Sequence, residues 1–425
     1  MNNENIDIAM HNQNAQKEPI KYVKKTRPIF SILGVGGGGC SSLHRIISSF
    51  YNQSSWEDII NVGGIKFIAT NTDHQSLYSC NLVETCIQLG NDGLGAGSDP
   101  EKGKAAAEFS VSEIQKAIED SDIVIIVSCF GGGTGTGSSP YIANVAKEMG
   151  KLVICFIIKP FKCEGDRKME LAEEGIKNIK DVADTIVVFS NQLLFNVINS
   201  NTPIIEAYNI ADSIITEFIK SFIRILKFPD LMNVDFADFK KATENMGLAV
   251  FGFGEAEGDG CGIKAAEKAL SNPLLEPINN HRLMGAQNVL IHITGDKRLT
   301  LVEIDEIVNY ICQYTDKSNC CIKIGTTIVE NSNPDDNNYS ENTGFIDITS
   351  NSSSSEEKKK FIQVLFIATG FPKDTPQEKE KIINIENDSI DNNIEENQEV
   401  QEEKKTKTGW SWFFNTNKNE DLEQE

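Results

Sequence analysis

The chain has 425 residues, 40% of them hydrophobic, which is enough for two domains with ordinary apolar cores. Its formal net charge of −22 argues against a general nucleic-acid binder and against direct adhesion to anionic lipid, because both need a basic face. Ten cysteines without a C-x-x-C pair are typical of reduced thiols in the cytoplasm rather than of a disulfide framework or a zinc site.

The first stretch, residues 1–28, is polar and then basic, and we expect a disordered extension without a secretory signal. No apolar run is long enough for a membrane span. Residues 29–33 form the first predicted strand, and a helix is predicted from Leu43. Between them lies a glycine-rich turn, residues 34–39, whose backbone N–H groups could face a phosphate.

The glycines of this turn, Gly34, Gly36 and Gly39, also fit the dinucleotide-binding pattern G-x-G-x-x-G. Taken alone, they leave open an NAD(P)-dependent oxidoreductase. That fold expects an acidic residue about 20 positions further on. Here the next predicted strand, residues 65–69, is followed by Asn-Thr-Asp ending at Asp73, which is later than expected.

A further turn, residues 93–98, precedes a predicted helix at residues 101–109. Asp99 is the expected N-cap of this helix and Pro100 its first residue. On these residues alone, the turn is simply the start of a capped helix.

A second glycine run has the sequence GGGTGTG at residues 131–137. It follows an apolar, β-branched stretch, residues 123–127, that predicts a buried parallel strand. It precedes a predicted helix at residues 140–147. On such a strand-to-helix turn, backbone N–H groups and the helix dipole face an anion, and the hydroxyls of Thr134 and Thr136 can add donors. The run lacks the lysine of the common phosphate-binding loop.

The chain then alternates again between strands and helices. A predicted strand at residues 152–158 leads into a charged segment, residues 159–168, and another at residues 185–189 ends near Asn191. A long helix is predicted at residues 204–227. Its apolar positions form a broad stripe, so we expect it to be buried on most sides.

Two aspartates, Asp235 and Asp238, lie three residues apart at a predicted helix start, which puts both carboxylates on one face. On spacing alone, capping of that helix is the simpler explanation. A second domain follows, with predicted strands at residues 248–254, 288–294, 321–326 and 361–370 and a predicted helix at residues 262–271.

Several of these segments together resemble the FtsZ family of the tubulin/FtsZ superfamily. The run GGGTGTG matches the superfamily's signature, and the resemblance extends over about residues 29–371. Other matches are Asn-Thr-Asp ending at Asp73, Lys-Pro-Phe at residues 159–161, and Ser-Asn-Pro-Leu-Leu-Glu at residues 271–276. The resemblance implies an α/β fold with a Rossmann-like GTP-binding domain on a parallel sheet (residues 29–203), a long central helix (204–228) and a smaller α+β C-terminal activating domain (229–372).

The resemblance also implies a pocket for GTP or GDP with Mg²⁺. Glu164 would hold the ribose, Asp212 would accept from guanine N1–H and N2–H₂, and Tyr208 would stack on the base, although a core role is the better interpretation of Tyr208 by itself. Lys168 takes the family's usual arginine position and Arg167 lies one residue earlier, so either could meet the nucleotide. The full implied set is Gly36, Gly37, Gly38, Gly39, Cys40, Ser41, Asp73, Ala96, Gly97, Gly132, Gly133, Thr134, Gly135, Thr136, Glu164, Arg167, Lys168, Asn191, Tyr208 and Asp212.

The spacing of Asn233, Asp235 and Asp238 matches the family's catalytic loop, which enters the nucleotide pocket of the next subunit. The resemblance therefore implies a GTPase completed by assembly into head-to-tail homopolymers, acting in the cytoplasm at the division (septal) ring. Cys40 and Ser41 stand where the family usually has Gly-Asn, which leaves open a non-hydrolysing filament modulator.

Three further stretches are expected to be disordered: an Asn/Ser-rich insertion (about residues 329–358), an acidic linker (373–408) and an aromatic tail (409–425). The tail contains Trp410 and Trp412, and exposed aromatics in such a tail suggest a docking peptide. The resemblance implies a membrane-tethering division protein as its partner.

Overall fold

The structure is a computed structural model that describes residues 28–51, 64–196, 198–199, 201–227, 231–232, 234–271, 283–316, 319–329 and 359–372. Apart from Pro28 and Val329, the predicted N-terminal extension, insertion, acidic linker and aromatic tail lie outside these residues. Asn233 and residues 272–276 also lie outside them, so the predictions made for all these segments stay predictions.

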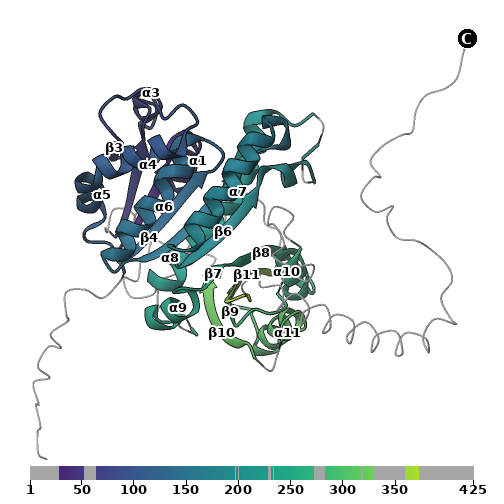
Figure 1. The fold of residues 1–425 in the computed structure, drawn as a ribbon. Coiled ribbons are helices and arrows are strands. Elements are labelled where there is room, and N and C mark those ends of the chain that lie inside the picture. Colours follow the sequence, from purple (N-terminus) through teal and green to yellow (C-terminus); the bar gives the residue numbers. More distant parts are fainter. Residues whose placement is uncertain are drawn as a thin grey trace, which may run out of the picture. The chain divides into compact units, whose positions relative to one another are not determined.

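The N-terminal domain is built on a seven-stranded sheet in the order β3-β2-β1-β4-β5-β6-β7 (Figure 1). All neighbouring strands run parallel, which confirms the predicted parallel sheet. The central strands are apolar and buried because helices cover both faces. The strands are Phe30–Val35 (β1), Ile65–Asn71 (β2), Thr85–Gln88 (β3), Ile123–Cys129 (β4), Leu152–Lys159 (β5), Thr185–Ser190 (β6) and Gly247–Leu248 (β7).

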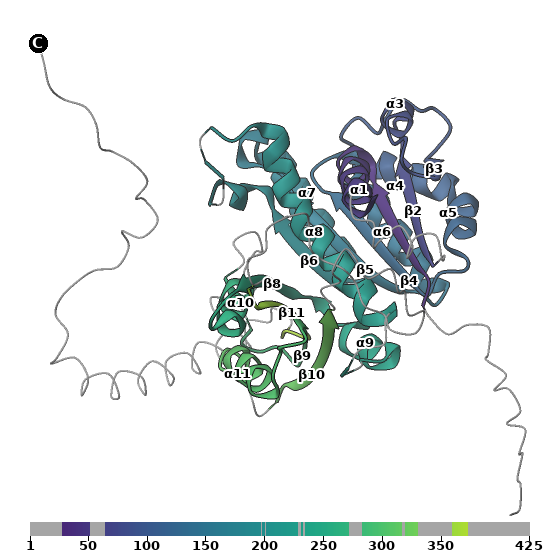
Figure 2. The ribbon, with the colours of Figure 1, turned by 180° about the vertical axis from the view of Figure 1, so that it is seen from behind.

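Two layers of helices enclose this sheet. One layer packs against the face seen in Figure 1, and the other against the face seen in Figure 2. None of the described helices is both long and apolar enough to cross a membrane. The first layer consists of α4 (Pro100–Phe109), α5 (Val111–Ile118), α6 (Gly133–Glu148) and α7 (Asp166–Lys180). The second layer consists of α1 (Gly36–Tyr51) and α8 (Ile204–Lys227). The shorter helices are α3 (His74–Tyr78), η1 (Lys162–Glu164) and η2 (Asn191–Asn196).

The glycine runs are more helical than predicted. Helix α1 begins at Gly36 and α6 at Gly133, each several residues before its predicted start. Glycine weakens a helix, but close packing requires it here. A Cβ on Gly137 would lie 1.8 Å from the carbonyl oxygen of Pro100, and one on Gly103 of α4 would lie 2.4 Å from that of Gly133. The glycines of α6 therefore let α4 lie directly against it.

The predicted central helix is observed as α8, with the predicted bounds. Phe218 and Phe222 of α8 contact Phe251 at ring-centroid distances of 4.8 and 5.1 Å. Nη1 of Arg224 lies 3.3 Å from Oε1 of Gln363. Since Phe251 and Gln363 belong to the second domain, α8 joins the apolar cores of both domains.

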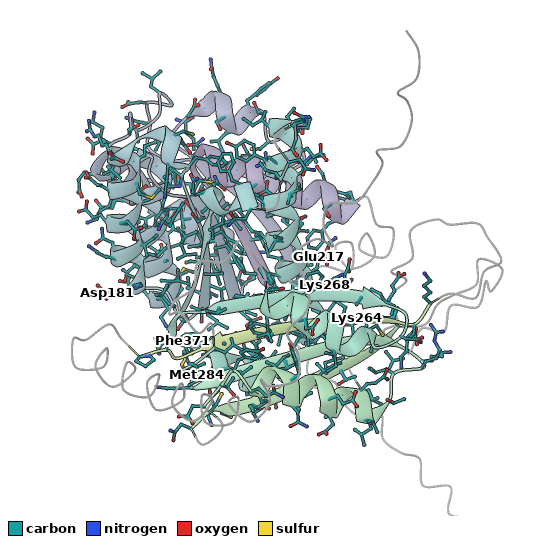
Figure 3. All side chains as sticks on the ribbon, turned by 90° about the vertical axis from the view of Figure 1, so that its right-hand side faces the viewer. Asp181, Glu217, Lys264, Lys268, Met284 and Phe371 are labelled. Carbon is teal, nitrogen blue, oxygen red and sulfur yellow. The ribbon has the colours of Figure 1, made fainter. Side chains whose placement is uncertain are left out.

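The second domain has a mixed sheet in the order β10-β9-β11-β8 (Figure 2). Strands β9 and β10 are parallel, and β11 is antiparallel to both of its neighbours. Figure 3 shows Lys264 and Lys268 of helix α10 (Cys261–Leu270). Their ammonium groups donate to the backbone carbonyls of Asp259, just before this helix, and of Glu255 in strand β8 (Val250–Glu257). The elements are α9 (Phe236–Thr243), β8 (Val250–Glu257), α10 (Cys261–Leu270), β9 (Asn288–Asp296), α11 (Leu301–Cys312), β10 (Cys321–Val329) and β11 (Phe361–Thr369).

The stretch predicted as one strand, residues 248–254, is divided between the two sheets. Its first residue, Leu248, belongs to β7 at the edge of the N-terminal sheet, Ala249 belongs to neither strand, and residues 250–254 belong to β8. A fully buried carboxylate organises this junction, because Asp184 accepts from the backbone N of Val153 and Asn245, both at 2.9 Å, and from Nζ of Lys147 at 2.6 Å. A pattern of apolar residues carries no information about this change of sheet.

Candidate functional site

A cavity of about 460 Å³ opens where the chain leaves the central strands β1, β4 and β5. The strand order reverses between β1 and β4, and open parallel sheets bind ligands at such a switch point. Helix α1 follows β1 and α6 follows β4, so two helix N-termini face the cavity. The predicted residues that line it are Gly36, Gly37, Gly38, Ser41, Gly132, Gly133, Thr134, Gly135, Glu164, Lys168, Asn191, Tyr208 and Asp212.

The two glycine runs touch each other and present open backbone to the cavity. Gly36 has a φ of 75°, and a Cβ there would lie 2.9 Å from the backbone N of Gly135. A Cβ on Gly132 would meet nothing within 4 Å among the described residues. The buried Nδ2 of Asn71 has no hydrogen-bond partner in the described part of the chain and lies 4.0 Å from the Cβ position of Gly37. Open N–H groups and an unpaired amide donor suit an anion such as a polyphosphate.

Helix α8 contributes a buried acid and an aromatic ring. Asp212 forms an ion pair with Arg45 of α1. Burial raises the pKa of Asp212, and the hydrogen bonds and charge supplied by Arg45 and Ser42 oppose that rise. The Arg45 guanidinium lies 5.8 Å from the ring centroid of Tyr208, which also meets Phe161 edge to face at 6.2 Å. An acceptor oxygen beside an aromatic ring can recognise a base that carries two adjacent N–H donors.

A charged pair stands at the entrance to α7. Oε1 of Glu164 accepts from the backbone N of Phe161, and Oε2 accepts from Nζ of Lys168, both at 2.9 Å. Lys168 lines the cavity, whereas the exposed Arg167 does not. Of the two cations that the sequence left open, the structure brings Lys168 to the cavity.

Three predicted residues of the glycine runs are turned into the protein. A Cβ on Gly39 would lie 2.4 Å from a backbone oxygen of β4, so this glycine serves packing. The thiol of Cys40 is buried and donates to the carbonyl of Gly34 at 3.4 Å. The hydroxyl of Thr136 accepts from the backbone N of Gly131 at 2.9 Å, which holds the loop rather than facing the cavity.

Three more predicted residues lie in the neighbouring loops and do not line the cavity. Asp73 caps α3 by accepting from the backbone N of Gln75 at 3.0 Å. Ala96 is buried, and a Cβ on Gly133 would lie 2.8 Å from its Cβ. The loop that carries Ala96 and Gly97 therefore abuts the second glycine run. The predicted N-cap and first residue of α4 are confirmed.

Arg45 lines the cavity but is not among the residues predicted from the sequence. A helix that starts within the first glycine run puts Arg45 one turn after Ser41, on the same face, and this cation at helical spacing was the available signal. Ser42 and Cys129 also line the cavity, and nothing in the sequence marks them.

Asp235 and Asp238 lie away from this cavity, beyond the C-terminal end of α8. Asp235 is the N-cap of α9 and accepts from the backbone N of Asp238 at 2.6 Å, so the capping that spacing alone favoured is observed. Nζ of Lys323 lies 3.0 Å from Oδ1 of Asp238. Both carboxylates remain accessible to solvent.

Known proteins share both domains of this chain. Residues 30–199 match the GTPase domain of the Tubulin/FtsZ family, and residues 247–335 match the FtsZ family C-terminal domain. The chain is 40% identical over 314 residues to a cell division protein FtsZ of Rickettsia felis, which covers 73% of this chain and 66% of that protein, just under two thirds.

Two further relatives extend the likeness. The chain is 38% identical over 298 residues to the cell division protein FtsZ 2 of Rhizobium meliloti, covering 69% of this chain and 81% of that one. Among solved structures, an empty FtsZ dimer of M. jannaschii matches with a TM-score of 0.64 at 33% identity, covering 82% of this chain and 90% of that one.

Proposed function

The chain belongs to the FtsZ family, and from this premise we propose that it binds GTP in the cavity and hydrolyses it between adjacent subunits of a head-to-tail filament. The filament forms the ring that divides the cell, at the cytoplasmic division site. The second glycine run and the match to both FtsZ domains argue against the dinucleotide-dependent oxidoreductase.

One observation supports a site shared between subunits: the proposed catalytic acids do not line the cavity of their own subunit. Asp212 lines the cavity near the start of α8, and Asp235 and Asp238 follow the far end of that helix at Lys227. An α-helix rises by about 1.5 Å per residue, so the two ends of this stretch are about 20 Å apart. This separation supports the proposal that a nucleotide in the cavity meets these acids on another subunit.

Exposed apolar side chains support such a contact. Leu94, Phe195 and Ile204, which lie in or next to the loops and helix starts around the cavity, are 90%, 58% and 70% exposed. Leu231, just before the two aspartates, is 75% exposed. The surface around the cavity and the surface that carries Leu231 are different parts of the subunit. A contact between the first surface of one subunit and the second surface of the next is therefore heterologous and extends into a filament.

In this arrangement Asp212 selects guanine, and Glu164 holds the ribose. The N–H groups of the glycine runs hold the phosphates and stabilise the charge that builds up on the γ-phosphate. Asp235 and Asp238 of the next subunit orient the attacking water and accept its proton.

Mg²⁺ fits this site only as a partner of the phosphates. Among the described residues, no group of three or more His, Cys, Asp or Glu side chains could hold a metal. Mg²⁺ commonly takes one or two carboxylates and fills the rest of its shell with phosphate oxygens and water. When bound, it neutralises phosphate charge.

The test is phosphate release measured against protein concentration, with Mg²⁺ present and sedimentation in parallel. A threshold above which turnover and pelleting rise together supports the proposal. Asp235→Ala should abolish turnover and keep GTP binding, while Asp181→Ala, an exposed carboxylate after α7 (Figure 3), should match the wild type. Turnover proportional to protein from the lowest concentration would refute the shared site, and GTP binding without turnover or pelleting would favour the non-hydrolysing modulator.

We also propose that the aromatic tail, residues 409–425, docks on a membrane-tethering division protein. Its support is the aromatic cluster of Trp410, Trp412, Phe413 and Phe414, which follows a charged stretch with few apolar residues. Deleting the tail should spare filaments in vitro and lose recruitment in cells. Normal localisation of the truncated protein would contradict docking by this segment.

A further inference from the structure

Strand β10 is the platform on which the segment before the catalytic aspartates rests. The backbone N groups of Leu231 and Met232 donate to the carbonyl of Thr326 at 3.0 and 3.4 Å, and the N of Thr326 donates back to Met232 at 3.1 Å. Three residues earlier on the same strand, Lys323 reaches Asp238. The strand therefore fixes both the segment and one of its two acids.

The contact between Lys323 and Asp238 is an accessible ion pair. Nζ lies 3.0 Å from Oδ1, and the two side chains are 41% and 36% exposed. The hydrogen bond and charge of Asp238 raise the pKa of Lys323, with a smaller contribution from Asp235, so the ammonium is charged throughout the physiological range. Two carboxylates and one ammonium thus share the face that carries the catalytic segment.

We propose that Lys323 is a positioning residue for GTP hydrolysis: it holds the carboxylate of Asp238 toward the nucleotide of the next subunit and offsets one of the two negative charges brought to the polyphosphate. This inference rests on the proposed function, in which Asp238 acts in the neighbour's cavity.

The physical reason is the change of surroundings on assembly. In a free subunit, an ion pair this exposed contributes little to stability. Between subunits water is largely excluded, so the same charges interact more strongly. Without Lys323, Asp235 and Asp238 would approach a phosphate chain as two uncompensated negative charges. With Lys323 present, the three charged groups Asp235, Asp238 and Lys323 together carry one net negative charge, and Asp238 has a fixed partner.

The experiment compares Lys323→Ala with Lys323→Arg and with a matched control. Lys66→Ala is that control, because Lys66 also projects from a strand, is 40% exposed and pairs with Asp120 at 3.3 Å. For each variant, GTP turnover per pelleted subunit is measured together with the critical concentration for assembly. Urea unfolding confirms that every variant folds like the wild type.

We expect Lys323→Ala to lower turnover per pelleted subunit about 10-fold or more while the critical concentration changes less than about 2-fold. Lys323→Arg should recover most of the loss, and Lys66→Ala should match the wild type. Wild-type turnover in Lys323→Ala, or a change confined to the critical concentration, would overturn the inference while leaving the proposed function intact. Wild-type turnover in Asp238→Asn would overturn both.

Discussion

The packing of α4 against α6 predicts that Gly137 cannot accept even one methyl group. A Cβ at this position would lie 1.8 Å from the carbonyl oxygen of Pro100, at the first turn of α4. Ordinary contacts begin near 3.4 Å, so α4 would have to move by about 1.5 Å. Because Ser138 donates to the carbonyl of Gly103 at 2.8 Å, this movement would also strain a buried hydrogen bond between the same helices.

The magnitude follows from two opposing effects. Alanine favours a helix over glycine by about 1 kcal/mol. Overpacking a core costs about 1–3 kcal/mol, and straining the hydrogen bond from Ser138 costs about another 1 kcal/mol. We therefore expect Gly137→Ala to lower the free energy of unfolding by about 1–3 kcal/mol.

Gly132→Ala is the matched control from the same glycine run. A Cβ there meets nothing within 4 Å among the described residues, and the φ of −99° suits alanine. Its stability should stay within about 0.5 kcal/mol of the wild type, while the methyl group enters the cavity and weakens GTP binding. Urea unfolding and fluorescent-GTP titration measure the two effects. Equal urea midpoints for Gly137→Ala and the wild type would refute the packing argument.

Three further substitutions test the roles of three buried carboxylates, those of Asp184, Asp296 and Asp212. Asp184→Ala should lower the free energy of unfolding by about 3 kcal/mol or more, because it leaves Lys147 and two backbone N–H groups without their acceptor; a smaller urea shift would contradict this. Burial raises the pKa of Asp296, but hydrogen bonds from Arg298 and a backbone N–H outweigh it and lower that pKa overall. The stabilisation by the Asp296 carboxylate is thus present above its pKa in the unfolded chain and lost as the pH falls through its pKa in the folded protein. In pH-dependent denaturation, Asp296→Asn should cost about 1–2 kcal/mol at pH 7 and progressively less below about pH 4. A difference in stability that does not change with pH would refute the link between this pKa and stability. Asp212→Asn should weaken GTP about 10-fold or more and reduce its preference over ATP in competition titrations, and unchanged selectivity would remove this acid from base recognition.

The parallel sheet and α8 could be predicted because their signals are long and local. The buried strands are unbroken apolar runs, and the 24 residues of α8 keep one periodic stripe. The starts of α1 and α6 could not be predicted, since propensity puts glycine outside helices, and it is contacts with α4, with β4 and between the two runs that require glycine there. The position of β7 could not be predicted from local sequence either, because this strand joins the first sheet through contacts with Asp184, which is distant in sequence.

For the candidate site, the sequence located the loops better than the side chains. Strand-to-helix turns predicted where an anion could lie, and the cavity opens there. Spacing alone could not tell that Thr136 and Cys40 turn inward, because the direction of each side chain depends on where its helix starts. It also could not tell that Arg45 pairs with Asp212, because these two residues are far apart in sequence. The choice between Arg167 and Lys168 likewise needed the direction of α7.

The position of β11 has a consequence for synthesis of the chain. This strand is the last element among the described residues, yet it lies inside its sheet, between β9 and β8. The first six strands of the other sheet are complete by Ser190, and α8, which adds Tyr208 and Asp212 to the cavity, is complete by Lys227. The nucleotide cavity can therefore form before the second sheet, as domains generally fold from the N-terminus. The sheet that supports the proposed catalytic aspartates stays incomplete until residue 369 has left the ribosome. If the proposed shared site is correct, a growing chain would acquire its nucleotide cavity well before it could complete a neighbour's active site.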